Sequence, residues 1–320
     1  MVSDLDQLSR VETSKKPLFK SMLMPGTLTY DPVKNAYSMK QHTVRYLESA
    51  HNEAGRGMEL SELTLFQNRL LAFEDRTGIV FEILSKDKGA DSYAVPRFII
   101  SEGDGDTDKG MKWEWATVKD DELYIGSMGK EYTNPDGSIA NTNNLWVAIV
   151  SKTGEIRKKD WSKEYNFVRS ALGASSPGYV IHEAVLWSQH LKKWVFLPRR
   201  ISSEAYDENL DEKKGSNKLV LVDANFSKKP DVVEIKFANV DPLRGFSTFA
   251  FVPKTNDRHA IAIRSVEENC VGGDDQICKQ RSYVLVFDIL SGEVLMAETK
   301  INEEVKFEGI EFVDLYTAKA

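Results

Sequence analysis

Five strand-like segments of similar pattern recur along this chain and constrain its fold more than any other feature. In each segment a hydroxyl or carboxylate side chain precedes an apolar alternation, and the five read GMELSELTLF, MKWEWATVKD, VIHEAVLWSQ, RGFSTFAFVP and EGIEFVDL. The aligned side chains are 53, 69, 64 and 64 positions apart, and they are Ser61, Glu114, Glu183, Ser247 and Glu311. The chain of 320 residues divides into five such units of about 64 residues, a period that is typical of a β-propeller with one repeat per blade.

Turns and second strands follow most of these segments, which is the pattern of a hairpin. In the first repeat, the apolar runs 60–66 and 70–73 flank a polar break, Gln67-Asn68-Arg69. Only one short segment, 161–172, has a helical pattern. We therefore expect an all-β fold, a single five-bladed propeller domain over residues 1–320 with about four strands per blade. The repeated segment would be the innermost strand of each blade.

The fifth repeat breaks off soon after Glu311, so its second strand has to come from elsewhere in the chain. The N-terminal sequence Ser3-Asp4-Leu5-Asp6 stands in the place that Glu74-Asp75 takes in the first repeat. We therefore expect both chain ends to complete one blade, which closes the ring and removes exposed sheet edges.

Composition excludes several classes of protein. The net charge of −7 argues against nucleic-acid binding, and no apolar run approaches the ~18 residues that span a bilayer. The first residues do not form a signal peptide, so the sequence corresponds to the mature chain if the protein is secreted. The two cysteines, Cys270 and Cys278, flank a Gly-Gly-Asp-Asp turn. They favour a loop disulfide and a secreted setting, although two free thiols fit the spacing as well.

The aligned ring of three glutamates and two serines has a chemical consequence. Buried carboxylates cost several kcal/mol unless they are paired or bind a metal. A set made only of oxygen donors suits Ca²⁺, whereas zinc, copper and iron prefer histidine or cysteine. The alternative for any single glutamate is that it is solvated at a strand start, but the fivefold alignment favours the metal.

Charged residues gather where the second strands end. The carboxylates are Asp4, Asp6, Glu74 and Asp75, and the candidate substrate-binding cations are Arg76, Lys130, Arg199, Arg200, Lys214 and Arg264. For Lys213-Lys214 alone, ordinary surface charge is the better interpretation. A metal, cations and a free carboxylate are what phosphoanhydride hydrolysis requires, because cations neutralise phosphate oxygens and a carboxylate positions the attacking water. A P-loop NTPase is excluded, because the chain has no GxxxxGK[ST] sequence.

At these residues the chain resembles the calcium-activated nucleotidase family of apyrases. The blocks SDLD, GRGMELS, EDRTG, SEGDG, KWEW, LYIGSMGKE, SPGYVIHEA, FLPRR, KKGSN, GFSTFAF and KFEGIEF fall in family order over nearly the whole chain. The resemblance implies one Ca²⁺ in the central channel, with the calcium ligands Ser61, Glu62, Glu114, Glu183, Ser247 and Glu311. Glu62 stands where the family usually has Asp. Asp4 and Asp75 are implied as catalytic residues.

The resemblance also implies an activity: hydrolysis of nucleoside di- and triphosphates, such as ADP and ATP, to monophosphates. Because the family includes salivary apyrases of blood-feeding insects, one expectation is a secreted inhibitor of platelet aggregation that acts as a monomer or weak dimer. The alternatives are a non-catalytic propeller that binds a ligand or protein partner at the channel mouth, and a calcium-propeller lactonase or similar hydrolase.

Overall fold

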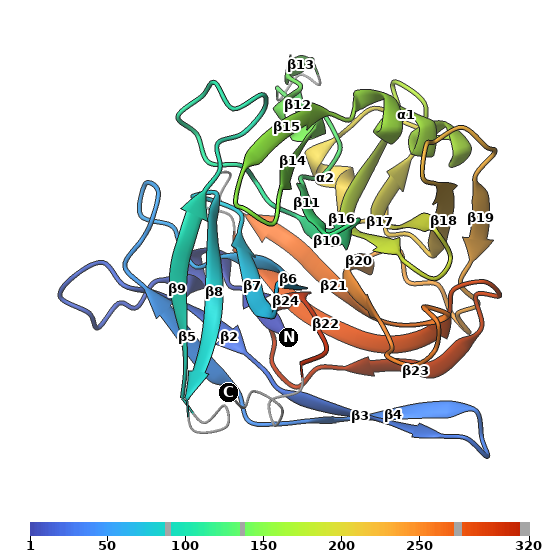
Figure 1. Cartoon of the computed structure of the whole chain (residues 1–320), viewed down its shortest axis with the longest axis horizontal. Helices are drawn as coiled ribbons and strands as arrows, with labels where there is room; N and C mark the ends of the chain where they lie inside the picture. The colour runs from blue at the N-terminus through green and yellow to red at the C-terminus, as the bar shows by residue number, and fades with distance from the viewer. Residues whose placement is uncertain (87–90, 135–137, 272–276, 314–320) are drawn as a thin grey trace.

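Five four-stranded antiparallel sheets are arranged as the blades of a propeller in the computed structural model, which describes residues 1–86, 91–134, 138–271 and 277–313 (Figure 1). From the innermost strand outward, the first two blades are β6 (Leu60–Phe66), β7 (Arg69–Glu74), β8 (Ile79–Lys86) and β9 (Asp91–Ile99), then β10 (Trp115–Lys119), β11 (Glu122–Gly126), β14 (Trp146–Val150) and β15 (Ile156–Asp160). The next two are β16 (Tyr179–Ser188), β17 (Lys193–Ser202), β18 (Lys218–Asp223) and β19 (Asp231–Glu234), then β20 (Gly245–Phe251), β21 (His259–Val271), β22 (Ile277–Asp288) and β23 (Val294–Lys300).

The fifth blade joins the two ends of the chain. Its order is β24 (Lys306–Gly309), β1 (Val2–Asp4), β2 (Phe19–Leu23) and β5 (Arg45–Ser49). Antiparallel pairing places Val2 opposite Gly309 and Asp4 opposite Lys306. The expectation that the N-terminal segment supplies the missing second strand of the last repeat is therefore confirmed.

The innermost strands form a closed ring. Neighbouring contacts run from β6 to β10, β16, β20 and β24, and from β24 back to β6. The five-bladed propeller predicted from the repeat is confirmed. One detail differs: β24 ends at Gly309, and the described residues that follow it, up to Val313, are not in a strand.

Apolar side chains fill the spaces between blades. One cluster lies between β10 and β16 and contains the indoles of Trp115, Trp161 and Trp194, packed with ring centroids 4.9–6.4 Å apart. The helix α1 (Ser162–Ala171) covers this cluster with Tyr165 and Val168, which agrees with the helix predicted over 161–172. Burial of such large aromatic rings fixes how adjacent blades pack.

Tight turns join the strands within a blade. Gln67 and Asn68, between β6 and β7, both have positive φ angles, as do Asp120 and Asp121 between β10 and β11. Two consecutive positive φ angles define a type I′ turn, whose twist matches that of a hairpin. These turns hold the two strands of each hairpin side by side, so the polar residues at the open end of a hairpin lie close together.

Smaller elements lie outside the blades. They are the hairpins β3 (Gly26–Asp31) with β4 (Ala36–Gln41) and β12 (Tyr132–Thr133) with β13 (Ile139–Asn141), the short helix α2 (Glu208–Asp211), and the 3₁₀ helices η1 (Asp6–Ser9) and η3 (Asn143–Leu145). Cys270 and Cys278 form a disulfide between β21 and β22, with an S–S distance of 2.05 Å. Within the described ranges, no helix has the length and apolar composition needed to cross a membrane.

Candidate active site

Irregularities in three innermost strands bring polar side chains out of the regular ladder. The pairing of β6 shifts between Leu60 and Glu62, that of β16 between His182 and Val185, and that of β20 between Phe246 and Thr248. The residues skipped include Ser61, Glu183 and Ser247, which are three of the five aligned positions. A β-bulge changes the direction of the side chain of the extra residue, so these irregularities turn the aligned side chains into the ring.

Arg199, on β17, is the cation to which the ring residues converge. Its guanidinium donates to Glu183, to Ser247 Oγ at 3.4 Å, to Glu308 Oε1 at 3.2 Å and to Glu267 Oε2 at 2.6 Å. The Arg199 side chain is only 4% exposed. Burial opposes its charge, but the three carboxylates hold the pKa of Arg199 well above its ordinary value. The arginine thus keeps three acidic side chains from different blades together.

Lys112, in the segment that leads into β10, holds two further carboxylates, those of Asp75 and Glu114. Its ammonium group donates to Asp75 Oδ2 and lies 3.0 Å from Glu114 Oε1. Burial raises the pKa of Glu114 to about 8, even though Lys112 opposes that shift. Asp75 Oδ1 is buried and accepts no hydrogen bond from any described residue.

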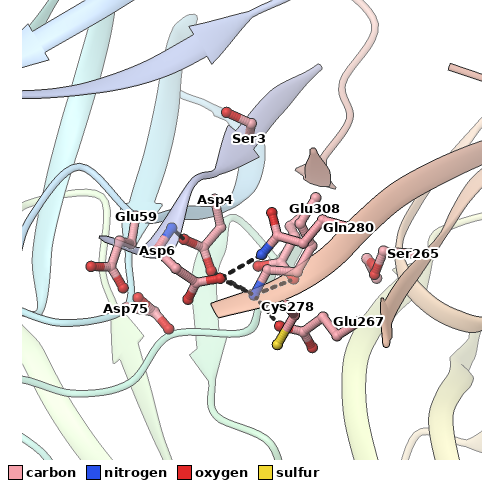
Figure 2. Close-up of polar contacts among 12 residues, drawn as sticks. Ser3, Asp4, Asp6, Glu59, Asp75, Ser265, Glu267, Cys278, Gln280 and Glu308 are labelled. Atoms are coloured by element: carbon pink, nitrogen blue, oxygen red, sulfur yellow. Dashed lines mark hydrogen bonds and ion pairs between the residues drawn. The ribbon is translucent and has the colours of Figure 1, made fainter. Parts of the chain in front are cut away.

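The end of β1 and the start of η1 add Asp4 and Asp6 to the site (Figure 2). Lys306 Nζ lies 2.7 Å from Asp4 Oδ2, 3.7 Å from Asp6 Oδ2, 3.2 Å from Glu267 Oε1 and 3.4 Å from Glu308 Oε1. Although burial disfavours its charged form, Lys306 holds the pKa of Asp4 below its ordinary value. Asp6 adopts a positive φ of 45°, a left-handed conformation in which aspartate is enriched among residues with a side chain.

Glu59 lies beside these two aspartates. One carboxylate oxygen from each of Asp4, Asp6 and Glu59 lies within 4.8 Å of the others. Arg56 donates to Glu59 from Nε at 2.8 Å and approaches Asp6 Oδ1 at 3.2 Å. Burial, with repulsion from Asp4 and Asp75, raises the pKa of Glu59 to about 9. Sequence comparison between repeats gives Glu59 no role, because the other repeats have no equivalent of it.

The charged residues described above carry more negative than positive side chains. Among the described residues, four cations, Arg56, Lys112, Arg199 and Lys306, contact eight carboxylates, which are those of Asp4, Asp6, Glu59, Asp75, Glu114, Glu183, Glu267 and Glu308. We name these twelve residues the central cluster. Such an excess of buried carboxylates is costly unless protons or metal ions neutralise it.

The donor set fits a calcium ion. Ser61 Oγ is buried and has no hydrogen-bond partner in the part of the chain that the structure describes, so it is free to serve as a ligand. Glu62 makes no hydrogen bond or ion pair with the central cluster among the described residues: its carboxylate accepts from Thr248 Oγ1 at 2.9 Å, which links β6 to β20, and from the Leu63 backbone N–H at 2.8 Å, and its acidic neighbour is Glu311. All of these donors are oxygen atoms, as Ca²⁺ prefers.

Glu311 is not brought to this group, and the glutamate of its blade that joins the central cluster is Glu308. The chain leaves the sheet after Gly309, and the Glu311 carboxylate accepts from the backbone N–H groups of Leu65 and Phe312, at 3.2 and 2.7 Å. Leu65 is close to the turn end of β6, far along the strand from Ser61. Equal spacing of 64 residues selected Glu311, but the last strand is shorter and begins its exit earlier.

Two predicted substrate-binding cations lie elsewhere. Arg264 pairs with Glu298 at 2.7 Å and donates to the Ser216 and Arg244 carbonyls. Its neighbour Ser265, on the opposite face of β21, contacts Ser247. Lys214 pairs with Glu204, a residue whose side chain is 70% exposed, at 2.6 Å. The structure therefore supports the surface interpretation of Lys214.

Three other predicted cations, Arg200, Lys130 and Arg76, make no ion pair with the central cluster within the described chain. Arg200 is 2% exposed and lies 3.6 Å from Asp211, with its side chain on the strand face opposite to that of Arg199. Lys130 lies 4.1 Å above the ring of Tyr206 and donates to Thr133 Oγ1 at 3.2 Å. Arg76 follows Asp75 directly, and its Nε has no hydrogen-bond partner among the described residues.

Sequence reasoning missed several members of the central cluster. Lys112 and Lys306 each lie just before an innermost strand or at its start, two residues before Glu114 and Glu308 respectively. This shared spacing, a lysine two positions before the ring glutamate, is a sequence signal that identifies both lysines and Glu308 together. Arg56 and Glu267 carry no such repeat signal, and only the folded chain brings them to the site.

The chain is similar in sequence to known proteins over nearly its whole length. Residues 5–313 match the family model described as Apyrase. The chain is 40% identical over 316 residues to soluble calcium-activated nucleotidase 1 of Mus musculus, covering 98% of this chain and 73% of that protein. It is 38% identical over 316 residues to an apyrase of Cimex lectularius, covering 98% and 81% of the two chains. It is 37% identical over 314 residues to apyrase apy-1 of Caenorhabditis elegans, covering 98% and 83%.

Proposed function

This chain belongs to the apyrase family, and we propose that it is a calcium-dependent phosphohydrolase that converts nucleoside di- and triphosphates to monophosphates and phosphate. The observation that carries the proposal is Asp75. Its carboxylate is 5% exposed, one oxygen is held by Lys112, and the other is buried without a partner in the described chain. A fixed carboxylate with one free oxygen can orient a water molecule for attack on phosphorus.

The proposed calcium ligands come from all five blades: Ser61, Glu62, Glu114, Glu183, Ser247 and Glu308. The ion would supply positive charge against the phosphate oxygens, in addition to that of the side chains. The free Ser61 Oγ and the excess of carboxylates over cations support such an ion. Glu308 takes the place first given to Glu311.

The chain's own cations would neutralise the substrate. Arg199 and Lys306 reach the centre of the ring on buried side chains, and a polyphosphate that entered the channel would meet both. Arg76, Lys130 and Arg200 are further candidates to bind the phosphates or the ribose. Asp4, held by Lys306, would help Asp75 to position the water that attacks the terminal phosphorus.

The experiment is phosphate release from ADP by the folded chain, with Ca²⁺, with Mg²⁺ and with a chelator. We expect release with Ca²⁺ and its loss on chelation, and a panel of ADP, ATP, UDP and GDP gives the preference. Asp75→Asn should lower turnover by about 10²- to 10⁴-fold, the range for a group that activates a nucleophile. The matched control is Asp121→Asn, because Asp121 is a turn aspartate with 74% exposure that pairs only with Lys152 among the described ion pairs.

Two outcomes would contradict the proposal. A folded sample that releases no phosphate at millimolar Ca²⁺ would favour the alternative, a propeller that binds a ligand or protein partner without catalysis. Full activity in Asp75→Asn would remove Asp75 from the mechanism. Secretion, a salivary role in inhibiting platelet aggregation, and a monomeric or weakly dimeric state stay predictions that come with the family.

A further inference from the structure

The turn between β18 and β19 carries an acceptor sequence for N-linked glycosylation, which has no part in the proposed hydrolysis of nucleotides. The triplet is Asn225-Phe226-Ser227, and the sequence contains no other Asn-X-Ser or Asn-X-Thr triplet in which X is not proline. Such triplets occur by chance, so the triplet alone does not distinguish an acceptor from an accidental match. The structure of the turn distinguishes the two.

Phe226 anchors the turn to the body of the protein. Its ring packs against those of Trp161, Trp194 and Phe196, with ring centroids 5.7, 6.3 and 6.2 Å away. Its two neighbours in the chain, Asn225 and Ser227, are both exposed. The apolar member of the triplet therefore faces the aromatic cluster, whereas the asparagine and the serine that define an acceptor are left at the surface, where a bulky glycan has room.

Asp223, the last residue of β18, organises the backbone of the same turn. Its Oδ1 accepts from the backbone N–H groups of Ser227 at 3.0 Å and Lys228 at 2.8 Å. Its Oδ2 accepts from the backbone N–H of Asn225 at 3.2 Å and from Ser227 Oγ at 3.0 Å. The side-chain amide of Asn225 takes no part in these bonds and has no hydrogen-bond partner among the described residues. A sugar on Asn225 Nδ2 would therefore break none of the contacts that hold the turn.

The turn lies at the end of its blade opposite to the central cluster. Asp223 pairs with Lys193, the first residue of β17. Arg199 is six residues farther along β17, which is about 20 Å at about 3.3 Å per residue. In addition, β18 and β19 are the two outer strands of the blade and lie at the edge of the molecule in Figure 1. A glycan on this turn would leave the channel open to substrate.

We propose that Asn225 receives an N-linked oligosaccharide when the chain passes through a eukaryotic secretory pathway. The Cys270–Cys278 disulfide fits this route, because disulfides persist in the oxidising compartments of that pathway. The donor is a lipid-linked oligosaccharide diphosphate. A bond forms between Asn225 Nδ2 and C1 of the first sugar, the bond from C1 to the diphosphate oxygen breaks, and the lipid diphosphate leaves as the amide loses one proton.

The experiment detects the glycan by mass. The full chain is produced in mammalian cells behind a cleavable secretory signal, and the chain from which the signal has been removed is collected from cells and medium together. Peptide N-glycosidase in H₂¹⁸O then converts a glycosylated asparagine to an aspartate that carries ¹⁸O, and a sample without the enzyme controls for spontaneous deamidation. We expect enzyme-dependent label at residue 225 in the wild type and in Ser227→Thr, and none in Asn225→Gln or Ser227→Ala.

Ser227→Thr is the matched control, because threonine keeps both the acceptor triplet and a hydroxyl group beside Asp223. A processed wild-type chain without enzyme-dependent label at residue 225 overturns the proposal, and so does label that persists in Ser227→Ala.

The position of the turn is tested separately by phosphate release from ADP. We expect the same kcat/KM before and after the glycan is removed, and a lower value for the glycosylated chain would contradict the separation of the turn from the site. The glycan itself is detected by mass alone, so its presence or absence is established whether or not the chain hydrolyses nucleotides.

Discussion

Replacing Arg199 by methionine tests whether the central cluster is held together by charge. Methionine keeps much of the volume of the arginine stem but leaves Glu183, Glu267 and Glu308 without their shared cation. Removing one partner from a buried ion pair costs about 3–5 kcal/mol, because the remaining charge stays buried. At about 2.1 cal/mol/K of unfolding entropy per residue, a chain of 320 residues would lose about 4–8 °C in Tm.

The assay is thermal unfolding of matched variants, with and without Ca²⁺. Arg157→Met is the control, because Arg157 likewise donates to a carboxylate, with two hydrogen bonds to Glu122, but its side chain is 51% exposed. An exposed pair is worth at most about 1 kcal/mol, so the control should melt nearly as the wild type does.

Adding Ca²⁺ should show whether Arg199→Met destabilises the protein through lost charge or through lost packing. In Arg199→Met the ion no longer competes with a guanidinium for Glu183 and Glu308, so it should bind more tightly and raise Tm by more than it does in the wild type. The reasoning is refuted if Ca²⁺ stabilises Arg199→Met no more than the wild type, or if Arg199→Met without calcium melts together with Arg157→Met.

Three further predictions concern the glutamate Glu308, the buried His182 and the Cys270–Cys278 disulfide. Glu308→Gln should weaken calcium binding at least tenfold in a calorimetric titration, whereas Glu311→Gln should leave it unchanged; the reverse order would restore the sequence-based assignment. His182 is fully buried, stacks on Tyr165, and burial lowers its pKa to about 3. The imidazole of the unfolded chain binds a proton near pH 6.5, whereas the buried imidazole of the folded chain stays neutral down to about pH 3. The free energy of unfolding should therefore fall as pH decreases from about 6.5 to 3. His182→Phe should flatten this part of a plot of that free energy, measured by urea unfolding, against pH. Reduction of Cys270–Cys278 should lower Tm by only a few degrees, since the disulfide closes a loop with a sequence separation of eight residues between strands already paired; complete unfolding on reduction would contradict this.

The fold was predictable because its signal is repeated. Apolar alternation, turn residues and one polar group recur five times, so an error in one repeat does not change the architecture. The closure of the last blade was predictable too, because Ser3-Asp4 matches the position of Glu74-Asp75. In that blade Glu308, not the predicted Glu311, contacts Arg199 and Lys306, since β24 is only four residues long and its exit does not follow the period.

The cations of the site were harder to predict. Adjacent residues of a strand face opposite sides, so of Arg199 and Arg200 only Arg199 reaches the three glutamates, and Arg264 turns away to Glu298. Which of two neighbouring strand residues faces the ring depends on where the β-bulges lie, and the amino-acid sequence does not reveal their positions. Glu267 enters from β21 and Arg56 from the segment before β6, and nothing in the repeat marks either of them.

The blade that joins both chain ends has a consequence for biosynthesis. Lys306 is among the last described residues to leave the ribosome, whereas Asp4, its partner across the sheet, is among the first. The nascent chain therefore has to hold β1, β2 and β5 without an inner strand until β24 emerges. During that interval the open edge of β1 and the apolar side chains behind it are exposed, so we expect chaperone contact to be concentrated on this incomplete blade.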